Sequence, residues 1–196
     1  LNLCNKNMVK MDTNNNDGKA KHKLLLEVCM AAYYEGDLIK TRYTEHEYTN
    51  PGTASQLCTV LARSFADIGD IIRGKDLYRG DKEKKEKLEL KLKSFFKNIY
   101  DDLIKDQGKK DAAIKHYFDR KENFYRLRED WWIANRDQVW EALICHAPPD
   151  AQYFRKTACN GGEQTKGYCR CGDGKSKGAD ADQVPTYFDY VPQYLR

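Results

Sequence analysis

The chain has 196 residues, of which 40% are hydrophobic and 33% are charged. It has 34 Lys and Arg residues and 30 Asp and Glu residues, which gives a net charge of +4. This length suffices for one domain with its own core, whereas the mild charge argues against a dedicated nucleic-acid binder, which typically has clustered charge and a pI above about 9. No apolar run approaches the ~20 residues of a bilayer span and no secretory signal opens the chain, so we expect any membrane anchor to lie outside this sequence.

The N-terminal part combines a polar stretch with one helical pattern. Met8–Ala20 contains MDTNNNDGKA, which indicates a polar loop with nothing to bury. A helix is expected from about Lys21 to Tyr34. Its inner face is expected to hold Leu25, Val28, Cys29 and Ala32. The stretch 36–52, rich in Thr, Tyr and charge, is predicted to be a connecting loop.

The next helix has the clearest pattern in the chain. Its apolar residues form one continuous stripe at helical spacing, at Leu57, Leu61, Phe65, Ile68 and Ile72. The intervening Arg63, Asp67 and Asp70 are expected to face away from the core. Ser55 can act as N-cap, and Gly74 stands where a left-handed residue commonly ends a helix.

The second half of the chain continues in helices. Asp81–Lys105 has apolar residues at helical spacing under a dense Lys/Glu surface, and Gly108 follows it. Residues 111–145 indicate a short helix followed by a long one. The apolar edge of the long helix is expected at Phe124, Leu127, Trp131 and Ala134. The stretch 151–183 is predicted to be a Cys-, Gly- and Lys-rich loop, and Val191-Pro192 resembles a helix start with proline in the first turn.

These segments together predict the fold class. Every periodic segment has helical spacing and none alternates at two over more than a few residues, so we expect an all-α protein, a disulfide-stapled helix bundle with long loops. The expected core consists of Leu25, Val28, Leu61, Phe65, Ile68, Ile72, Leu92, Phe95, Ile99, Leu127 and Trp131.

Seven cysteines in a chain of this kind suggest an oxidising compartment. Cys4 stands far from the others, and a free thiol or a bridge within the chain is one interpretation of it. The remaining six permit 15 pairings and are the candidate disulfide residues Cys29, Cys58, Cys145, Cys159, Cys169 and Cys171.

Two strings imitate ligand-binding loops without matching them. The stretch 12–18 resembles a calcium loop, but its glycine is at the seventh position instead of the sixth, and the twelfth position is Lys23 instead of Glu. The stretch 171–176 ends like a phosphate-binding loop, but its opening glycine is replaced by Cys169 and no strand precedes it.

A metal site or a catalytic site is also not expected. Cys159, Cys169, Cys171 and His146 lack the paired spacing of structural zinc sites, which favours disulfides over zinc. Cys145 and His146 are adjacent on a helix, so their side chains point about 100° apart and do not form a nucleophile and base. We therefore expect no metal, no cofactor and no enzymatic activity.

Three tryptophans and one tripeptide invite a binding interpretation. Trp131, Trp132 and Trp140 could stack on carbohydrate, but packing in the core is favoured for all three, most clearly for Trp131, which shares the apolar edge of its helix. The tripeptide 79–81 spells Arg-Gly-Asp, the short integrin-recognition motif. Three residues occur often by accident, so we give this match no weight.

The feature most consistent with binding is a cationic surface. The stretch 79–93 has seven basic residues against four acidic ones, and the candidate glycan- or receptor-binding residues are Arg79, Lys82, Lys84, Lys85, Lys87, Lys91 and Lys93. Further cations follow at Lys105, Lys109, Lys110, Lys115, Arg120 and Lys121. Such a run is either a solvated helix face or a docking face for sulfated or sialylated glycans, on which several lysines sum their fields.

Four strings carry a family resemblance, in order and over nearly the whole chain: LLLEVCMAAYYEG at 24–36, LCTVLARSFADIGDIIRG at 57–74, LREDWWIANRDQVWEALIC at 127–145 and VPTYFDYVPQYLR at 184–196. They resemble the alpha class of the Duffy-binding-like (DBL) adhesion domains found in the variant erythrocyte membrane adhesins of Plasmodium falciparum. The resemblance implies that residues 1–20 are the end of a preceding subdomain and a polar loop. Residues 21–196 would then be the central helical subdomain, as a fragment that ends within a helix.

The same resemblance implies bridges and a function. It implies Cys58 bonded to Cys169 or Cys171, Cys29 to Cys145, Cys159 to the remaining loop cysteine, and a partner of Cys4 upstream of the chain. It implies attachment to host cells on the outer face of the infected red cell, by rosetting or endothelial binding. The implied partners are heparan sulfate, blood-group sugars, complement receptor, antibodies and adjoining domains. The alternative is a structural spacer and immune-decoy module with no receptor of its own.

Overall fold

The computed structural model describes residues 4, 6–10, 18–49, 56–77, 81–153, 167–171 and 184–196. These residues form helices and turns and no strand, so the all-α prediction is confirmed for the described part. The helices are α1 (Lys6–Val9), α2 (Ala20–Thr49), α3 (Leu57–Arg73), α4 (Lys82–Lys105), α5 (Lys110–Tyr117) and α6 (Tyr125–Leu143), followed by the 3-10 turns η2 (Phe188–Tyr190) and η3 (Gln193–Leu195).

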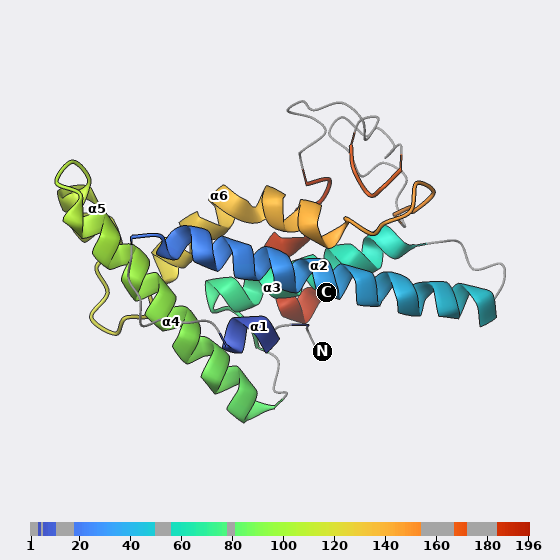
Figure 1. The fold of residues 1–196 in the computed structure, drawn as a ribbon, viewed down its shortest axis with the longest axis horizontal. Coiled ribbons are helices and arrows are strands. Elements are labelled where there is room, and N and C mark those ends of the chain that lie inside the picture. The colour runs from blue at the N-terminus through green and yellow to red at the C-terminus, as the bar shows by residue number, and fades with distance from the viewer. Residues whose placement is uncertain are drawn as a thin grey trace.

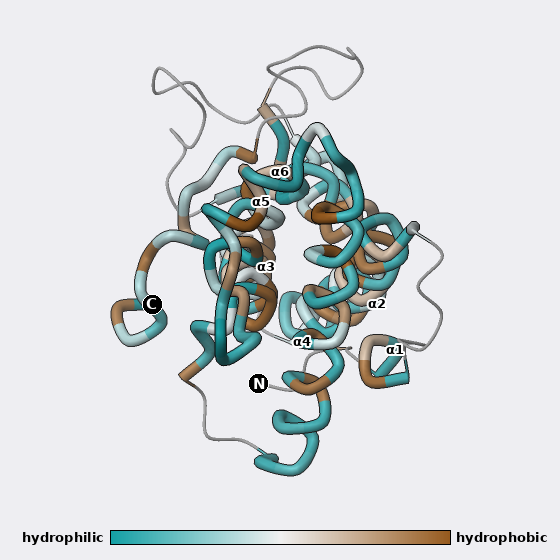
Figure 2. The backbone as a smooth tube through the Cα atoms, turned by 90° about the vertical axis from the view of Figure 1, so that its left-hand side faces the viewer, coloured by the Kyte–Doolittle hydropathy of each residue, from teal (hydrophilic) through white to brown (hydrophobic). Residues whose placement is uncertain are grey.

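Three helices build the centre of the molecule. Helices α2, α3 and α6 pack against one another, and α4 slants across one end of them (Figure 1). Viewed end-on, the helices surround a common interior (Figure 2), and most of their buried residues are apolar. Ten of the eleven expected core residues are buried, whereas Leu25 is only half-buried because its neighbour Leu24 occupies the inward position.

Helix α2 is longer than the sequence suggested, because it continues through the expected loop to Thr49. A Cβ atom at Gly36 would lie 1.9 Å from the carbonyl oxygen of Leu143, so this glycine permits close contact with α6 and does not end the helix. Farther along, Tyr43 packs on the core, and its hydroxyl accepts a hydrogen bond from the Gln56 backbone N–H at 2.6 Å. Tertiary contacts thus override the loop-like composition of this stretch.

Helix α3 has the expected stripe and the expected C-terminal end. Gly74 is left-handed at φ 72°, and its N–H donates to the carbonyl of Ile71 at 3.1 Å, while Lys75 N–H donates to the carbonyl of Asp70 at 2.8 Å. The expectation that Asp70 faces away from the core is wrong. Its carboxylate is buried and ion-paired, because the segment 184–196 packs over that side of α3. The proposed cap Ser55 lies outside the described residues.

The later helices follow the predicted order. Asp81 caps α4, and α5 and α6 are the predicted short and long helices. Ala134 was expected on the apolar edge of α6 but is exposed, because the buried side of that helix runs through Trp132 and Arg136 instead. After Pro192 the chain forms the single 3-10 turn η3, in place of the expected helix start.

The N-terminal stretch also differs from its expectation. Met8 was assigned to a polar loop, but it lies in the short helix α1 and is buried in the core. Asn7 fixes this helix, because its amide donates to both the backbone carbonyl and the carboxylate of Glu27 at 2.8 Å. Residues 11–17, including most of the calcium-like string, lie outside the described residues.

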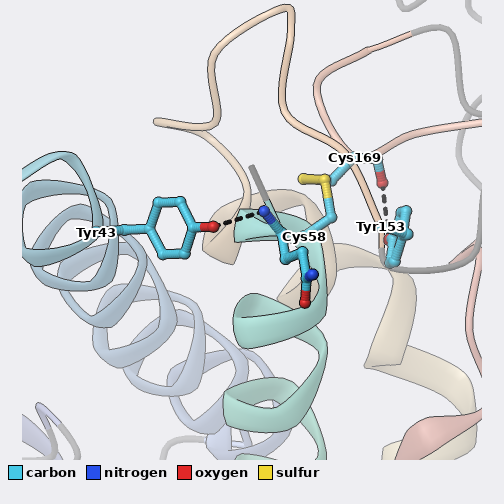
Figure 3. The surroundings of a disulfide bond; sticks show 5 residues. Tyr43, Cys58, Tyr153 and Cys169 are labelled. Carbon is cyan, nitrogen blue, oxygen red and sulfur yellow. Dashed lines mark hydrogen bonds between the residues drawn. A yellow bond between two sulfur atoms is a disulfide. The ribbon is translucent and has the colours of Figure 1, made fainter. Parts of the chain in front are cut away.

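One disulfide joins the start of α3 to a distant loop. Cys58 is bonded to Cys169 across 111 residues of sequence with a Cα–Cα distance of 5.4 Å, as the resemblance implied. The Tyr153 hydroxyl donates to the carbonyl of Cys169 at 3.2 Å beside this bridge (Figure 3), and burial raises the pKa of that hydroxyl. Cys171 is also disulfide-bonded, and Cys159 lies outside the described residues.

The expected bridge between Cys29 and Cys145 is wrong, because both are free thiols in the structure. The ring of His146 packs on Tyr33 with centroids 4.4 Å apart. Tyr33 lies one turn beyond Cys29 on α2, roughly 6 Å along the helix axis. The end of α6 is therefore offset from Cys29 by about a turn. Cys4 is likewise a free thiol, and its backbone N–H donates to Glu35 at 2.9 Å.

Candidate ligand-binding surface

The N-terminal half of α4 carries the cationic residues that the sequence singled out. The Asp81 carboxylate accepts a hydrogen bond from the Lys84 backbone N–H at 3.2 Å, which lowers the pKa of Asp81 and closes the helix end. The six candidate lysines at 82–93 follow on one continuous helix. Arg79 lies outside the described residues.

The helical period divides these lysines between different sides of α4. Successive residues rotate by about 100° around the axis, and the buried side chains of Leu88 and Leu92 fix which side faces the core. One flank then carries Lys84, Lys87 and Lys91. The opposite flank carries Lys82 and Lys93. The six candidate lysines therefore do not form one face, although a count along the sequence treats them as a single run.

Several of these lysines already have acidic partners. Lys84 pairs with Asp81 at 3.1 Å, and Lys87 pairs with Glu83 at 2.6 Å. Lys85 reaches back to Asp76, in the connection after α3, at 3.2 Å. These partners reduce the net field of the surface. The pairs of Lys84 and Lys87 are solvent-exposed, so each is weak and is readily exchanged for an external anion.

The second group of cations does not merge with the first. Lys105 lies at the C-terminal end of α4, roughly 18 Å along the helix axis from Lys93, the nearest lysine of the first group, and Lys109 follows in the turn before α5. The reach of a screened charge is only about 8 Å at physiological salt. Both lysines also have acidic neighbours, at Asp102 (3.5 Å) and Asp106 (3.0 Å). The two groups are therefore electrostatically separate surfaces.

An open hollow lies between α1 and α4, on the flank that carries Lys87 and Lys91. It has a volume of about 330 Å³. Its lining is Val9 from α1 and Lys87, Leu90, Lys91 and Ser94 from α4. Sequence reasoning missed this hollow, although the four α4 residues recur at intervals of three or four and so share one side of the helix.

The tryptophans are core residues and do not offer a sugar-stacking surface. Trp132 and Trp140 are fully buried against Phe65, with ring centroids 5.1 and 5.2 Å from it. Trp131 packs edge-on against Phe96. Among the exposed aromatic rings, three are tyrosines of the segment 184–196, namely Tyr187, Tyr190 and Tyr194.

A buried charge network holds that segment against the helices. The Asp189 carboxylate accepts hydrogen bonds from Arg136 and from the indole N–H of Trp132, and Arg73 donates to its backbone carbonyl. Burial alone would lower the pKa of the Arg136 guanidinium, but Asp189 raises it. Arg136 also lies under Tyr190, 5.5 Å from the ring centroid. This network is structural, because its members face one another and not a cavity.

Two other kinds of site, a membrane span and a metal centre, are not found among the described residues. None of the helices among them combines the length and apolar composition of a membrane span. Within the same residues, no group of three or more His, Cys, Asp or Glu side chains could hold a metal ion. The α4 surface and its hollow are therefore the best candidate site in the described part of the chain.

Comparison with known proteins agrees with this fold. The family model of the Duffy binding domain matches residues 1–196, and the chain therefore belongs to the Duffy binding domain family. The NTS-DBL1(alpha-1) domain of membrane protein 1 (PfEMP1) from the varO strain of Plasmodium falciparum is 39% identical, with a TM-score of 0.70. That match covers 98% of this chain and 39% of the other. No curated protein sequence matches the chain.

DBL domains of a second class, DBLbeta, from the same adhesin are also similar to this chain. The ICAM-1-binding DBLbeta domain of the PfEMP1 variant IT4var13 is 32% identical, with a TM-score of 0.63, over 96% of this chain and 38% of that one. A second structure of that DBLbeta domain, bound to ICAM-1, matches at a TM-score of 0.65. The chain thus spans about two fifths of the length of these solved relatives.

Proposed function

We propose that this chain is part of a host-cell adhesion module displayed on the outer face of the infected red cell. The observation that carries the proposal is its membership of the Duffy binding domain family, together with the ICAM-1 complex of a 32%-identical relative. A helical scaffold with no metal cluster in its described part and a polar surface suits recognition by contact. Binding through this scaffold would support rosetting or endothelial attachment.

The α4 surface is the proposed contact for an anionic partner. Its lysines lie on a regular helix at the edge of the molecule, where they can reach a long polyanion. Heparan sulfate is the partner that best fits several separate point charges. Blood-group sugars and complement receptor are neutral or protein partners and would need other contacts.

The runner-up is a spacer and immune-decoy module that presents variable surface to antibodies and holds adjoining domains apart. The ion pairs of Lys84, Lys85 and Lys87 favour it, because paired lysines are typical of a solvated helix face. This interpretation predicts no glycan binding by the chain.

A charge-reversal experiment separates the two. The first variant carries Lys82→Glu, Lys84→Glu, Lys85→Glu and Lys87→Glu. The matched control carries Lys105→Glu, Lys109→Glu, Lys110→Glu and Lys115→Glu. Both lose the same charge, so only position distinguishes them. We expect the first variant to leave a heparin column at much lower salt than wild type, and the control to remain close to wild type.

The adhesion proposal would also show in a glycan array and in binding to immobilised ICAM-1. Raising salt from about 0.05 to 0.5 M should weaken glycan binding strongly, because exposed lysines act through screened charge. Equal elution of wild type and both variants would argue for the spacer. Equal loss in both variants would mean that binding follows net charge and not the α4 surface.

A further inference from the structure

Helix α2 has apolar residues on two of its sides. Its inner side holds Leu24 and Val28, which are completely buried in the core. Its outer side holds Leu26, Met30 and Tyr34, which are 60%, 38% and 50% exposed. The helix lies along one outer side of the molecule (Figure 2). A surface helix of a globular protein usually has one apolar and one polar side, so the outer side of α2 has the composition of a contact surface.

The exposed residues of α2 form one straight stripe. At 100° per residue, Leu26 and Tyr34 lie about 40° to either side of Met30 around the helix axis. Lys23 and Asp37, each seven residues from Met30, lie within about 20° of it. The stripe therefore runs from a cation, over three apolar side chains, to an anion. Its steps of three or four residues are the spacing of a coiled-coil seam.

We propose that this stripe pairs with the same stripe of a second copy of the chain, with the two α2 helices antiparallel and a twofold axis at Met30. Such an interface uses the same surface on both copies. Met30 faces its own counterpart, and residues at equal distances on either side of it face each other, so that Leu26 of one copy lies beside Tyr34 of the other. The pairing goes beyond the proposed glycan binding and does not depend on it.

The charges at the two ends of the stripe select this arrangement. In an antiparallel pair, Lys23 of each copy comes level with Asp37 of the other, which gives two contacts between opposite charges. In a parallel pair, like charges would face each other at both ends, and juxtaposed like charges oppose association. A shift of seven residues in either direction would place Lys23 or Asp37 against Met30 and would lose both contacts. Charge thus defines both orientation and register, as it does in coiled coils.

Neighbouring side chains hold the stripe in place. The Tyr34 ring packs edge-on against Tyr33 with centroids 5.6 Å apart, and Tyr33 packs in turn on His146. The Asp37 side chain is 55% exposed and lies 3.9 Å from a ring nitrogen of His146, so a lysine of the second copy can reach it from solvent. Side chains that are already ordered lose less entropy on association.

The seam is short, so the pair is expected to be weak. From Lys23 to Asp37 it spans about 21 Å of helix axis, and one helix pair of this length buries less than the roughly 1,600 Å² of a standard interface. We expect a dissociation constant of about 10–100 µM. The chain is then a monomer when dilute, whereas copies tethered close together associate through their high effective concentration.

Charge-swap variants test the orientation by sedimentation velocity of the full chain at about 5–500 µM, a range that brackets the expected constant. Lys23→Asp and Asp37→Lys should each weaken association at least tenfold, because each creates two like-charge contacts in the antiparallel pair. The double variant should return to within threefold of wild type. A 1:1 mixture of the two single variants should also associate, because their stripes have complementary charges.

Matched controls separate the stripe from net charge. Lys21→Asp makes the first charge change on the opposite side of α2, and Asp137→Lys makes the second on α6, at a side chain that is 58% exposed. Each should change association less than twofold. Met30→Glu should weaken it more than tenfold by placing two carboxylates on the twofold axis, whereas Leu90→Glu, at a 65% exposed residue of α4, should leave it unchanged. Melting curves close to wild type show that each variant is folded.

Three outcomes would overturn the pairing. Wild type that sediments as a monomer at every concentration would exclude it. Association that the double variant does not restore would exclude the antiparallel arrangement, because a parallel pair remains repulsive after the swap. Equal weakening by Leu90→Glu and Met30→Glu would show that association is not specific to α2. In each case the heparin test of the α4 surface would keep its own result.

Discussion

Asp189 and Arg136 form a two-point contact in the interior, with guanidinium-to-carboxylate distances of 2.8 and 2.9 Å. The Asp189 side chain is completely buried, so both partners have exchanged water for each other. Removal of one partner from such a pair leaves an uncompensated buried charge, which costs more than the pair itself contributes. The segment 184–196 is therefore attached to α6 by a contact that tolerates little change.

Replacement of Asp189 by Ala should lower the free energy of unfolding by about 3–5 kcal/mol. Asp189→Asn, which keeps an oxygen for the Trp132 indole, should lose less. Urea titrations followed by tryptophan fluorescence measure both. The control is Asp137→Ala, because Asp137 is exposed and lies 4.0 Å from Arg136, and it should stay within about 0.5 kcal/mol of wild type. Equal losses at the two positions would show that the buried pair is not special.

Gly36→Ala should destabilise the protein although alanine is the better helix former by about 1 kcal/mol. The added Cβ would meet the Leu143 carbonyl oxygen at 1.9 Å, so α2 and α6 must separate. We expect a net loss of about 1–3 kcal/mol. Gly108→Ala is the matched control, since its nearest neighbour would be an Asp106 carboxylate oxygen at 3.4 Å. A gain in melting temperature for Gly36→Ala would contradict the helix contact.

Phe65→Ala removes a ring that is fully buried between Trp132 and Trp140. The lost burial and the remaining cavity should cost about 3–5 kcal/mol, enough to unfold a domain at the low end of ordinary stability. Calorimetry or chemical denaturation can measure the loss. Val60→Ala on the exposed side of the same helix should be nearly neutral. A similar cost at both positions would place the core elsewhere.

The two thiols Cys29 and Cys145 should differ in alkylation. Burial, with a smaller contribution from Glu141, raises the pKa of Cys29 to about 11, so its reactive thiolate is scarce at pH 8 and increases as pH rises toward 11. The exposed Cys145 should react first with iodoacetamide. Mass spectrometry over a pH series of the native protein measures both rates. Recovery of a Cys29–Cys145 peptide without reduction would refute the free thiols.

The burial of Cys29 also determines how the stability of the protein changes with pH. The native state keeps the Cys29 proton to higher pH than the unfolded chain, whose thiol has its ordinary pKa of 9.0. Stability from the buried thiol is therefore present below about pH 9 and is lost as pH rises through the native value. Cys29→Ser should flatten this part of the stability curve.

Local patterns predicted the helices, since the stripe of α3 and the turn at Gly74 are legible within a few residues. The predictions that failed concern residues whose contacts lie far along the chain. Gly36 looks like a helix end until Leu143 is placed beside it, and Asp70 looks solvent-facing until the segment 184–196 covers it. Sequence spacing contains no information about such distant neighbours.

The prediction of the candidate surface failed for a different reason. The lysines at 82–93 were found by counting charge, but a count ignores the direction in which each side chain points. The helical period alone separates Lys87 from Lys93, so this division was available from sequence. The hollow was not available, because it needs Val9 from α1, whose position depends on the packing of Met8 into the core.

The Cys58–Cys169 bridge also has a mechanical consequence. If the molecule is stretched by its two ends, tension passes across the sulfur–sulfur bond and bypasses the 111 residues between the cysteines. At ~3.6 Å per extended residue, roughly 400 Å of contour length is withheld from extension. Single-molecule pulling should release that length only after reduction. Most of α3 and all of α4, α5 and α6 would therefore carry no load while the chain is under tension.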